Sequence, residues 1–367
     1  MDLDALRALR LRVQGLRAPF DASAPEVVRR FVAVQAQEYL PSQWGLAQRV
    51  ADDRRPDAAA VAAAIDAGDI LRTHVLRPTW HYVHSADARW LLELSTERVH
   101  KQNALYYRRT GVEGEVATRG LDVLAETLAG GHRTRAELAA ALEAAGTPFT
   151  GIAFTYLLML AELERVAISG TGVGKQRTHA AFDERVPPSP PRPRGEALAE
   201  LAARFIASRG PVTERDFAAW SGFTLTDARR AFADAAHVAD GRLETVEVDG
   251  TPHHVDAASE PPVSDASRPA VDLLQAYDEY IMGYAPPRSF LLPDELDTLH
   301  AESPGHALLI DGVMAGRWAP VVQTRRATIR IVSWRKRSPA EEHALAASVA
   351  DLERFLGVPA SVEPAED

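Results

Sequence analysis

The feature that most constrains the fold of this chain is a helix start that recurs three times. Ser23 with Glu26, Thr134 with Glu137, and Thr213 with Asp216 each place a hydroxyl residue three positions before an acidic one. Such a pair can bond the free backbone N–H groups at a helix N-terminus. Each start leads into an apolar helix, and two strand-like segments follow. This is the order of a winged helix-turn-helix unit, so the sequence predicts three tandem units.

In the first unit, the helix that starts at Ser23 is predicted to continue through Gln35 and to end before Pro41. Proline disfavours helical geometry in the residue that precedes it. The other elements expected in this unit are a helix over 6–17, a helix over 57–67 that ends at Gly68, and strands over 70–75 and 79–83.

The second and third units are predicted from the same signals. The second unit should contain helices over 116–128, 134–145 and 154–164 and strands over 165–169 and 176–182. The third should contain helices over 196–208, 213–222 and 226–236 and strands over 243–248 and 253–255.

The C-terminal part has a different character. A polar linker over 260–269 precedes strand-like segments at 308–310, 316–320 and 328–334 and a closing helix over 338–355. Asp311-Gly312 predicts a tight hairpin. We therefore expect a mainly α fold with β structure, in which tandem winged helix-turn-helix units are followed by a small β-barrel-like domain. The predicted domains are 1–112, 113–190, 191–262 and 263–367.

Charge and composition restrict the class of protein. The net charge is −10, but basic residues cluster at 7–17, 98–109 and 325–337, so a local nucleic-acid contact remains compatible with the acidic total. The chain has no cysteine, which excludes disulfides and thiolate chemistry and fits a cytoplasmic protein. No signal peptide and no membrane span is predicted. We also expect no metal site and no cofactor.

Several segments resemble the AlkZ-like family of bacterial DNA glycosylases, in the family order and over nearly the whole chain. They are LRLRVQGL at 9–16, VQAQEY at 34–39, LRTHVLRPTWHYV at 71–83, YDEYIMGY at 277–284 and LLIDGVMAGRW at 308–318. Pro78 departs from the glycine that is usual in the third segment. The resemblance implies three winged-helix units and a barrel around a concave, C-shaped DNA channel. It also implies that Gln35 and Gln37 are catalytic.

The chemistry of two glutamines restricts the substrate. Glutamine is neither an acid nor a base, but it can orient water and present its carbonyl dipole to a positive sugar. Such help suffices for a leaving group that is already good, such as a purine alkylated at N7, which carries a positive charge. One geometric objection stands, because residues two apart on an α-helix point roughly 200° apart. Gln35 and Gln37 could not both face one sugar from a regular helix.

Other candidate residues have a structural and a functional interpretation. Glu38 is either a surface charge at a helix end or the base that activates water. His81 is either an ordinary strand histidine or a contact to the DNA backbone. Asp278 is either a helix cap, which we favour, or a residue that orients a channel side chain. The remaining candidates are DNA-binding residues: Arg72, Thr73, Arg77, Trp80, Arg325, Arg326, Arg330, Arg335 and Lys336. Arg77 would contact phosphate, and the last five would project from one strand to one face.

Three functions are compatible with these residues. The first is a monofunctional DNA glycosylase for cationic N7-alkylated purines, in particular bulky or crosslinked adducts of a genotoxic natural product. Its partner would be double-stranded DNA carrying alkylated purines, and it would act as a monomer with no protein partner. The alternative is a winged-helix DNA-binding protein or transcription regulator without chemistry, and a fold that only sequesters a toxin is a third. Regulators usually have a basic recognition helix and a dimer helix, which this chain lacks.

Overall fold

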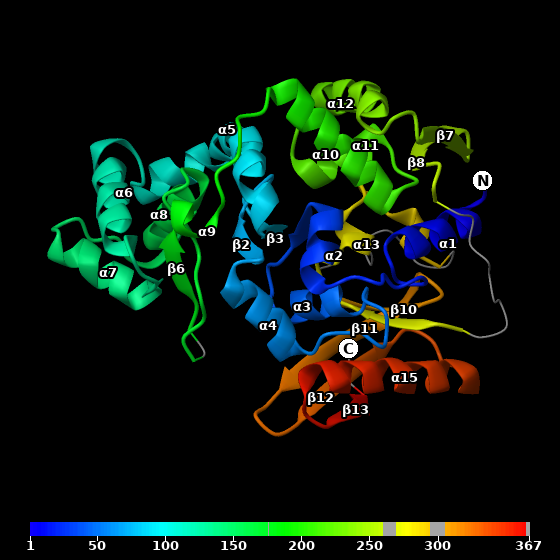
Figure 1. Cartoon of the computed structure of the whole chain (residues 1–367). Coiled ribbons are helices and arrows are strands. Elements are labelled where there is room, and N and C mark those ends of the chain that lie inside the picture. The colour runs from blue at the N-terminus through cyan, green and yellow to red at the C-terminus, as the bar shows by residue number, and fades with distance from the viewer. Residues whose placement is uncertain (175, 260–268, 294–304, 365–367) are drawn as a thin grey trace.

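The computed structural model describes residues 1–174, 176–259, 269–293 and 305–364. Figure 1 shows the second unit as a separate lobe at one end, the first unit in the centre, and the third unit beside it. A sheet with helix α15 lies below the first unit. Among the described residues, no helix is long and apolar enough to cross a membrane.

The first unit is built on a three-stranded sheet of order β1-β3-β2. Its elements are α2 (Ala24–Phe31), β1 (Ala33–Gln35), α3 (Tyr39–Ala47), α4 (Ala58–Ala67), β2 (Ile70–His74) and β3 (Trp80–His84). Helix α1 (Leu3–Val13) precedes them and the long helix α5 (Ser85–Thr110) follows. The predicted capping box at Ser23 and the helix end at Gly68 are both present.

The predicted helix through Gln35 is wrong. Helix α2 ends at Phe31, because Val32 adopts a positive φ of 67° that no α-helix can continue. The next three residues form β1. Pro41 does not stop a helix but lies in the first turn of α3, where a missing N–H costs nothing.

The other two units repeat the strand order of the first. The second contains α6 (Gly114–Leu128), β4 (Arg133–Thr134), α7 (Arg135–Ala144), α8 (Gly151–Leu163), β5 (Ala167–Ser169), β6 (Thr178–Ala181) and α9 (Phe182–Arg185), with sheet order β4-β6-β5. The third contains α10 (Arg194–Arg209), α11 (Glu214–Ser221), α12 (Leu225–Val238), β7 (Leu243–Val248) and β8 (Thr251–Asp256). There the bridge from Val212 to His254 takes the place of the first strand. The predicted capping boxes at Thr134 and Thr213 are present.

The C-terminal part is an open sheet instead of the expected barrel. Its elements are β9 (Val271–Leu274), α13 (Glu279–Met282), η1 (Ser289–Leu291), β10 (His306–Ile310), β11 (Val313–Val322), β12 (Ala327–Ser333), α15 (Pro339–Leu356) and β13 (Ala360–Pro364). The strand order is β13-β12-β11-β10-β9, so β13 and β9 lie at opposite edges. Helix α15 is the crossover that makes β13 parallel to β12. The predicted Asp311-Gly312 turn is present, while the predicted linker over 260–269 lies almost entirely outside the described residues.

Candidate active site

The glutamine pair lies at the end of β1. Gln35 faces His81 in the β1–β3 ladder, and the N–H of Ala36 extends it by donating to the carbonyl of Trp80 at 2.7 Å. Alternate residues of an extended chain point to the same side. The objection that two glutamines cannot face one sugar assumed a helix, so it no longer applies; β1 ends at Gln35, and the chain bends at Gln37. Gln35 is 2% exposed, whereas Gln37 is exposed.

Gln35 is held at its side chain and its backbone. Arg77, in the turn between β2 and β3, donates from Nη2 to Gln35 Oε1 at 2.7 Å. The backbone N–H of Gln35 donates to Glu279 Oε1 at 2.9 Å, and its carbonyl accepts from Gln275 Nε2 at 3.2 Å. Because the side-chain carbonyl is already bonded to Arg77, the group that Gln35 can offer a substrate is its amide NH₂. Nη2 of Arg77 is thus used inside the protein, and the expected phosphate contact of Arg77 stays a prediction.

Gln37 lies against Arg72 and Trp80. The Trp80 N–H donates to Gln37 Oε1 at 3.4 Å. Arg72 donates from Nε to the carbonyl of Ala36 at 2.9 Å, and its guanidinium lies 4.4 Å from the Trp80 ring centroid. Burial lowers the pKa of Arg72 to about 10, so it stays cationic at neutral pH. Arg72 and Trp80 therefore form a rigid, positively charged wall beside the exposed glutamine.

A buried ion pair fixes the turn before β1. Arg209, at the end of α10, donates to the carbonyls of Phe31 and Ala33 at 3.1 and 3.0 Å, on either side of Val32. Its guanidinium pairs with Glu279 at 2.5 Å, and both side chains are fully buried. A β-branched residue at positive φ is strained, by about 1–3 kcal/mol, and persists only where its surroundings impose it. The Arg209–Glu279 pair supplies those surroundings.

His81 is a fully buried, neutral histidine. Its Nδ1 donates to the carbonyl of Thr79 at 2.9 Å, and its Nε2 is buried and has no hydrogen-bond partner among the described residues. Burial, and secondarily the charge of Arg77, lower the pKa of His81 well below its usual value. The neighbouring Thr73 is also buried, with its hydroxyl 3.4 Å from Glu162. Both side chains are buried in the protein without DNA, and the DNA contact expected of them stays a prediction.

The two acidic candidates differ in their surroundings. Asp278 is buried, caps α13 by accepting from the N–H of Tyr280 at 2.9 Å, and pairs with Arg49 at 2.7 Å. The cap that we favoured is present, together with this ion pair. Glu38 is the N-cap residue of α3, makes no side-chain cap, and lies 3.5 Å from His306 Nε2 with 43% of its side chain exposed.

The basic residues of the C-terminal sheet do not share one strand face. Arg325 and Arg326 lie in the exposed turn between β11 and β12, and only Arg330 lies on β12 itself. Arg335 and Lys336 follow the other end of this seven-residue strand, roughly 20 Å away. Arg335 is also paired with Glu341 at 2.6 Å. The structure thus separates the expected patch into two groups.

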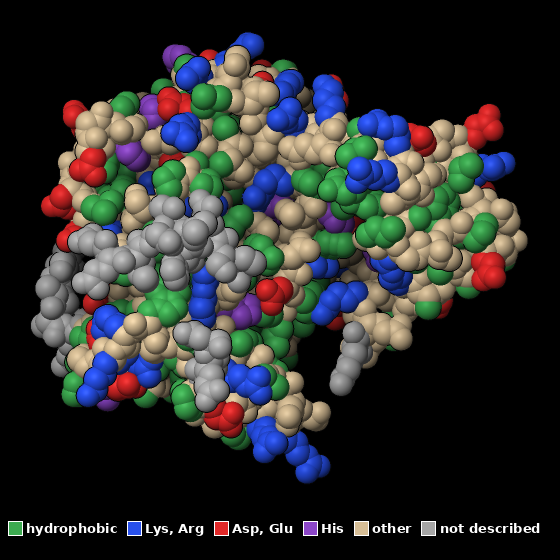
Figure 2. Space-filling model, turned by 180° about the vertical axis from the view of Figure 1, so that it is seen from behind, with side chains coloured by type: hydrophobic (Ala, Val, Ile, Leu, Met, Phe, Trp, Pro, Cys, Tyr) green, Lys and Arg blue, Asp and Glu red, His purple; other side chains and the backbone are tan. Residues whose placement is uncertain are grey.

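Figure 2 shows that the molecule is hollowed on one face, between the lobe of the second unit and the rest, with Lys and Arg side chains around the hollow. A cleft of about 680 Å³ lies between the first and second units, and Arg72, Trp80, Arg135, Phe154 and His179 are among its lining residues. It adjoins Gln37 through the shared residues Arg72 and Trp80.

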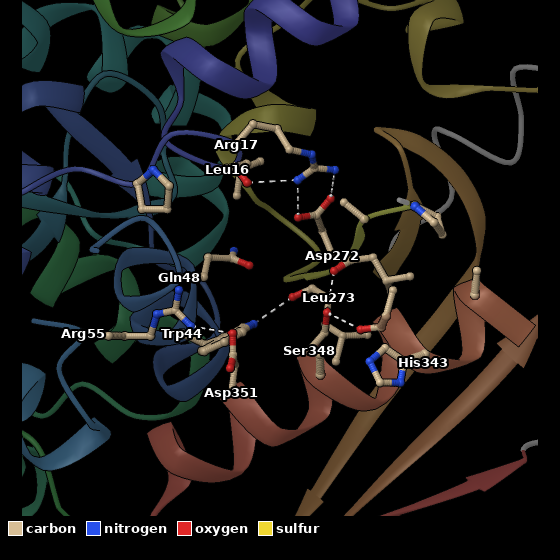
Figure 3. Close-up of a pocket in the computed structure, with 17 residues that line it drawn as sticks. Leu16, Arg17, Trp44, Gln48, Arg55, Asp272, Leu273, His343, Ser348 and Asp351 are labelled. Carbon is tan, nitrogen blue, oxygen red and sulfur yellow. Dashed lines mark hydrogen bonds and ion pairs between the residues drawn. The ribbon is translucent and has the colours of Figure 1, made fainter. Parts of the chain in front are cut away.

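A second cavity, of about 600 Å³, lies between α3, β9 and α15 (Figure 3). Its charged side chains are paired across the cavity wall, Arg17 with Asp272 at 2.7 Å and Arg55 with Asp351 at 2.6 Å. None of the predicted catalytic or DNA-binding residues lines it. We therefore place the candidate active site at Gln35 and Gln37, in the first unit.

Reasoning from the sequence missed three residues that shape this site: Arg209, Glu279 and His306. Glu279 stands beside Asp278 in the segment YDEYIMGY, so an acidic residue among aromatic ones was a usable signal. Arg209 and His306 have no comparable local signal. They reach the site from elements that are 174 and 271 positions away from Gln35 in the chain (209 − 35 and 306 − 35).

Comparison with known proteins identifies the class. A family model described as DNA glycosylase AlkZ-like matches residues 28–355. The chain therefore belongs to the AlkZ-like family of DNA glycosylases, and it is an enzyme of that kind. This favours the glycosylase over the non-enzymatic regulator.

A solved structure, the Streptomyces sahachiroi DNA glycosylase AlkZ, superposes with a TM-score of 0.77 at 21% sequence identity. The match covers 99% of this chain and 100% of that one. At this identity the likeness establishes the fold. No curated protein matched the chain.

Proposed function

We propose that this glycosylase hydrolyses the N-glycosidic bond of cationic N7-alkylated purines in double-stranded DNA. The observation that carries the proposal is the pair of amides at the end of β1, Gln35 fixed by Arg77 and Gln37 exposed beside Arg72. Gln37 orients the attacking water through its exposed side-chain amide, and Gln35 supports that water through its NH₂ group. The two amides can orient the water and present their dipoles to the reacting sugar, but they cannot transfer a proton.

The reaction balances without a proton for the leaving base. The water oxygen bonds to C1′ as the bond from C1′ to the purine nitrogen breaks, and one proton of the water is released, finally to solvent. The electron pair of that bond moves into the ring and neutralises the positive charge created by alkylation. His81, the histidine opposite Gln35, is neutral because its pKa is lowered. A neutral buried histidine is a poor general acid, and this favours a substrate that leaves unassisted.

The cleft beside Gln37 supports a bulky substituent on the purine. Its volume of about 680 Å³ is in the usual range for sites that hold drug-sized molecules. Aromatic and cationic side chains line it together, which suits a planar group with hydrogen-bond acceptors. We accordingly propose bulky or crosslinked adducts of a genotoxic natural product as substrates, so that the enzyme protects cells against such a compound.

The rest of the chain would hold the duplex. We propose that the three repeated units are winged-helix units, with boundaries at 1–112, 113–190 and 191–262, and that residues 263–367 form the fourth domain. The hollow of Figure 2 would be the C-shaped DNA channel. Arg72, Trp80, Arg325, Arg326 and Arg330 would contact the DNA, and the protein would act as a monomer.

The experiment is a base-release assay on duplexes that carry N7-methylguanine, a bulky N7-guanine adduct, uracil or hypoxanthine. Gln35→Ala and Gln37→Ala should each lower the single-turnover rate on N7-alkylguanine by about 10²-fold. Their affinity for the same duplex should stay unchanged. Gln102→Ala, an exposed glutamine on α5, is the matched control and should behave like the wild type.

Two results would contradict the proposal. Release of uracil or hypoxanthine at a rate similar to that of N7-alkylguanine would show that the enzyme does not depend on a cationic leaving group. Loss of DNA affinity in parallel with activity would show that the glutamines serve binding or folding.

A further inference from the structure

A contact between Glu38 and His306 joins the segment after β1 to the C-terminal sheet. Glu38 directly follows Gln37, and its Oε2 lies 3.5 Å from Nε2 of His306 on β10. The chain bends at Gln37 and Glu38, where β1 gives way to α3. Both Glu38 and His306 line a cavity of about 310 Å³, together with Trp318 and Pro320 of β11. The carboxylate is 43% exposed, so water reaches it.

The orientation of the His306 ring is determined by its other contacts. The N–H of Ala276 donates to Nδ1 at 2.9 Å, so Nδ1 must be an acceptor without a proton. The proton of the neutral ring is therefore on Nε2, the atom that faces Glu38. The ring also packs on Trp318 with a centroid distance of 4.9 Å. Only 11% of the His306 side chain is exposed. These contacts fix the ring with its protonated nitrogen, Nε2, 3.5 Å from the carboxylate of Glu38.

Burial favours the neutral form of His306. Burial lowers its pKa and Arg317 lowers it further, while Glu38 opposes both. A neutral His306 takes no proton from Glu38 but can orient it through one hydrogen bond. One carboxylate oxygen of Glu38 then accepts this hydrogen bond, and the other remains free to accept a proton. This is how an orienting partner prepares a general base for proton transfer.

We infer that His306 is a positioning residue that holds Glu38 as the general base for the water oriented by Gln37. The inference rests on the proposed function. In the step, the water oxygen bonds to C1′ and the purine leaves with the electron pair of the glycosidic bond. The proton released by the water passes to the free oxygen of Glu38, which later returns it to solvent. His306 touches neither the DNA nor the water, and acts through Glu38 alone.

The test is a double-mutant cycle on single-turnover release of N7-methylguanine. Glu38→Gln should lower the rate by about 10²-fold because it removes the base. His306→Phe keeps a ring against Trp318 but removes the donor, and should lower the rate about tenfold through misplacement of the carboxylate. His306→Gln restores an N–H donor and should recover most of the loss. In the Glu38→Gln background, His306→Phe should have almost no further effect.

The results distinguish a positioning role of His306 from a merely structural one. They also distinguish failure of this inference from failure of the proposed function. If the losses from His306→Phe and Glu38→Gln multiply in the double variant, His306 does not act through Glu38 and the inference is wrong. It is equally wrong if Glu38→Gln retains the wild-type rate while Gln37→Ala does not, an outcome that leaves the proposed function intact. A wild-type enzyme that releases no N7-alkylguanine would instead overturn the proposed function. Thermal unfolding and DNA affinity of each variant check that the protein remains folded.

Discussion

At the scale of single residues, the backbone of Val32 decides where the glutamines point. Its positive φ ends α2 at Phe31, although the sequence pattern predicts a helix through Gln35, and the chain enters β1 in an extended conformation. Valine is a poor residue for such a conformation, so no propensity rule predicts it. The strain is outweighed by the two hydrogen bonds that Arg209 makes on either side of Val32. As a result, the position of Gln35 depends on Arg209, which is far from it in the sequence.

The buried histidines predict how stability depends on pH. Burial lowers the pKa of His81 and His179 below 6.5, so the unfolded chain binds more protons than the folded one as the pH falls below that value. Their contribution to stability is complete above about pH 6.5 and is lost as the pH decreases toward the folded pKa. The expected slope is about 1.4 kcal/mol per pH unit for each group.

Urea unfolding at pH 7.5, 6.0 and 5.0 measures this slope. His81→Asn keeps a donor for the carbonyl of Thr79 but removes the titrating ring, and should give a shallower slope in this window. Carboxylates such as Glu162, whose pKa is lowered from 4.5, titrate below the window. An unchanged slope in His81→Asn would mean that His81 is protonated in the folded protein.

At the scale of elements, the junction between α2 and β1 depends on α10 and α13. Arg209 on α10 and Glu279 on α13 meet in the core, and Trp220 of α11 donates to the same carboxylate at 3.1 Å. Such a pair links segments that the chain separates widely. Its desolvation cost is large, so either charge alone is unfavourable.

Breaking this pair should therefore be costly. Arg209→Met or Glu279→Gln should each lower the free energy of unfolding by about 3–5 kcal/mol, because the remaining charge is buried without a partner. The double variant should lose less than the sum of the two, since no unpaired charge remains. Urea unfolding of the three variants measures both effects, and strictly additive losses would contradict the coupling.

The basic residues at the two ends of β12 should determine how DNA binding depends on salt concentration. Arg325→Ala/Arg326→Ala removes two exposed cations from the turn between β11 and β12 and should reduce the slope of log K against log salt by about 2. Arg335→Ala/Lys336→Ala removes the same charge, but Arg335 is already paired with Glu341, so its effect should be smaller. Binding titrations at several salt concentrations compare the two double variants. Equal effects would mean that DNA binding depends on the total charge of the protein and not on where the charges lie.

At the scale of the whole molecule, substrate size should depend on the cleft between the first and second units. Ala139 on α7 lines this cleft, and Ala139→Trp should fill part of it. Release of a bulky N7-guanine adduct should then fall about tenfold or more, while release of N7-methylguanine stays within about twofold. Ala140→Trp on the same helix points to solvent and serves as the control. Equal losses on both substrates would show that the cleft does not hold the substituent.

Much of the architecture follows from local signals in the sequence. The capping boxes at Ser23, Thr134 and Thr213 are present as predicted, and so are the Asp311-Gly312 turn and the closing helix, for which Ser338 is the cap. Each of these depends on residues within a few positions of one another, so the local chain contains the whole cause. The three-fold repetition of helices and hairpins was predictable for the same reason.

The features that were not predictable depend on contacts between distant segments. The strand at Gln35 exists because β3 pairs with it and because Arg209 and Glu279 hold the turn before it. The open sheet exists because α15 returns the chain to the far side of β12. The sequence by itself determined the helix starts, the turns and the choice of two amides. Only the tertiary structure decided where those amides point, because long-range pairing and the neutralisation of buried charge outweigh local propensity.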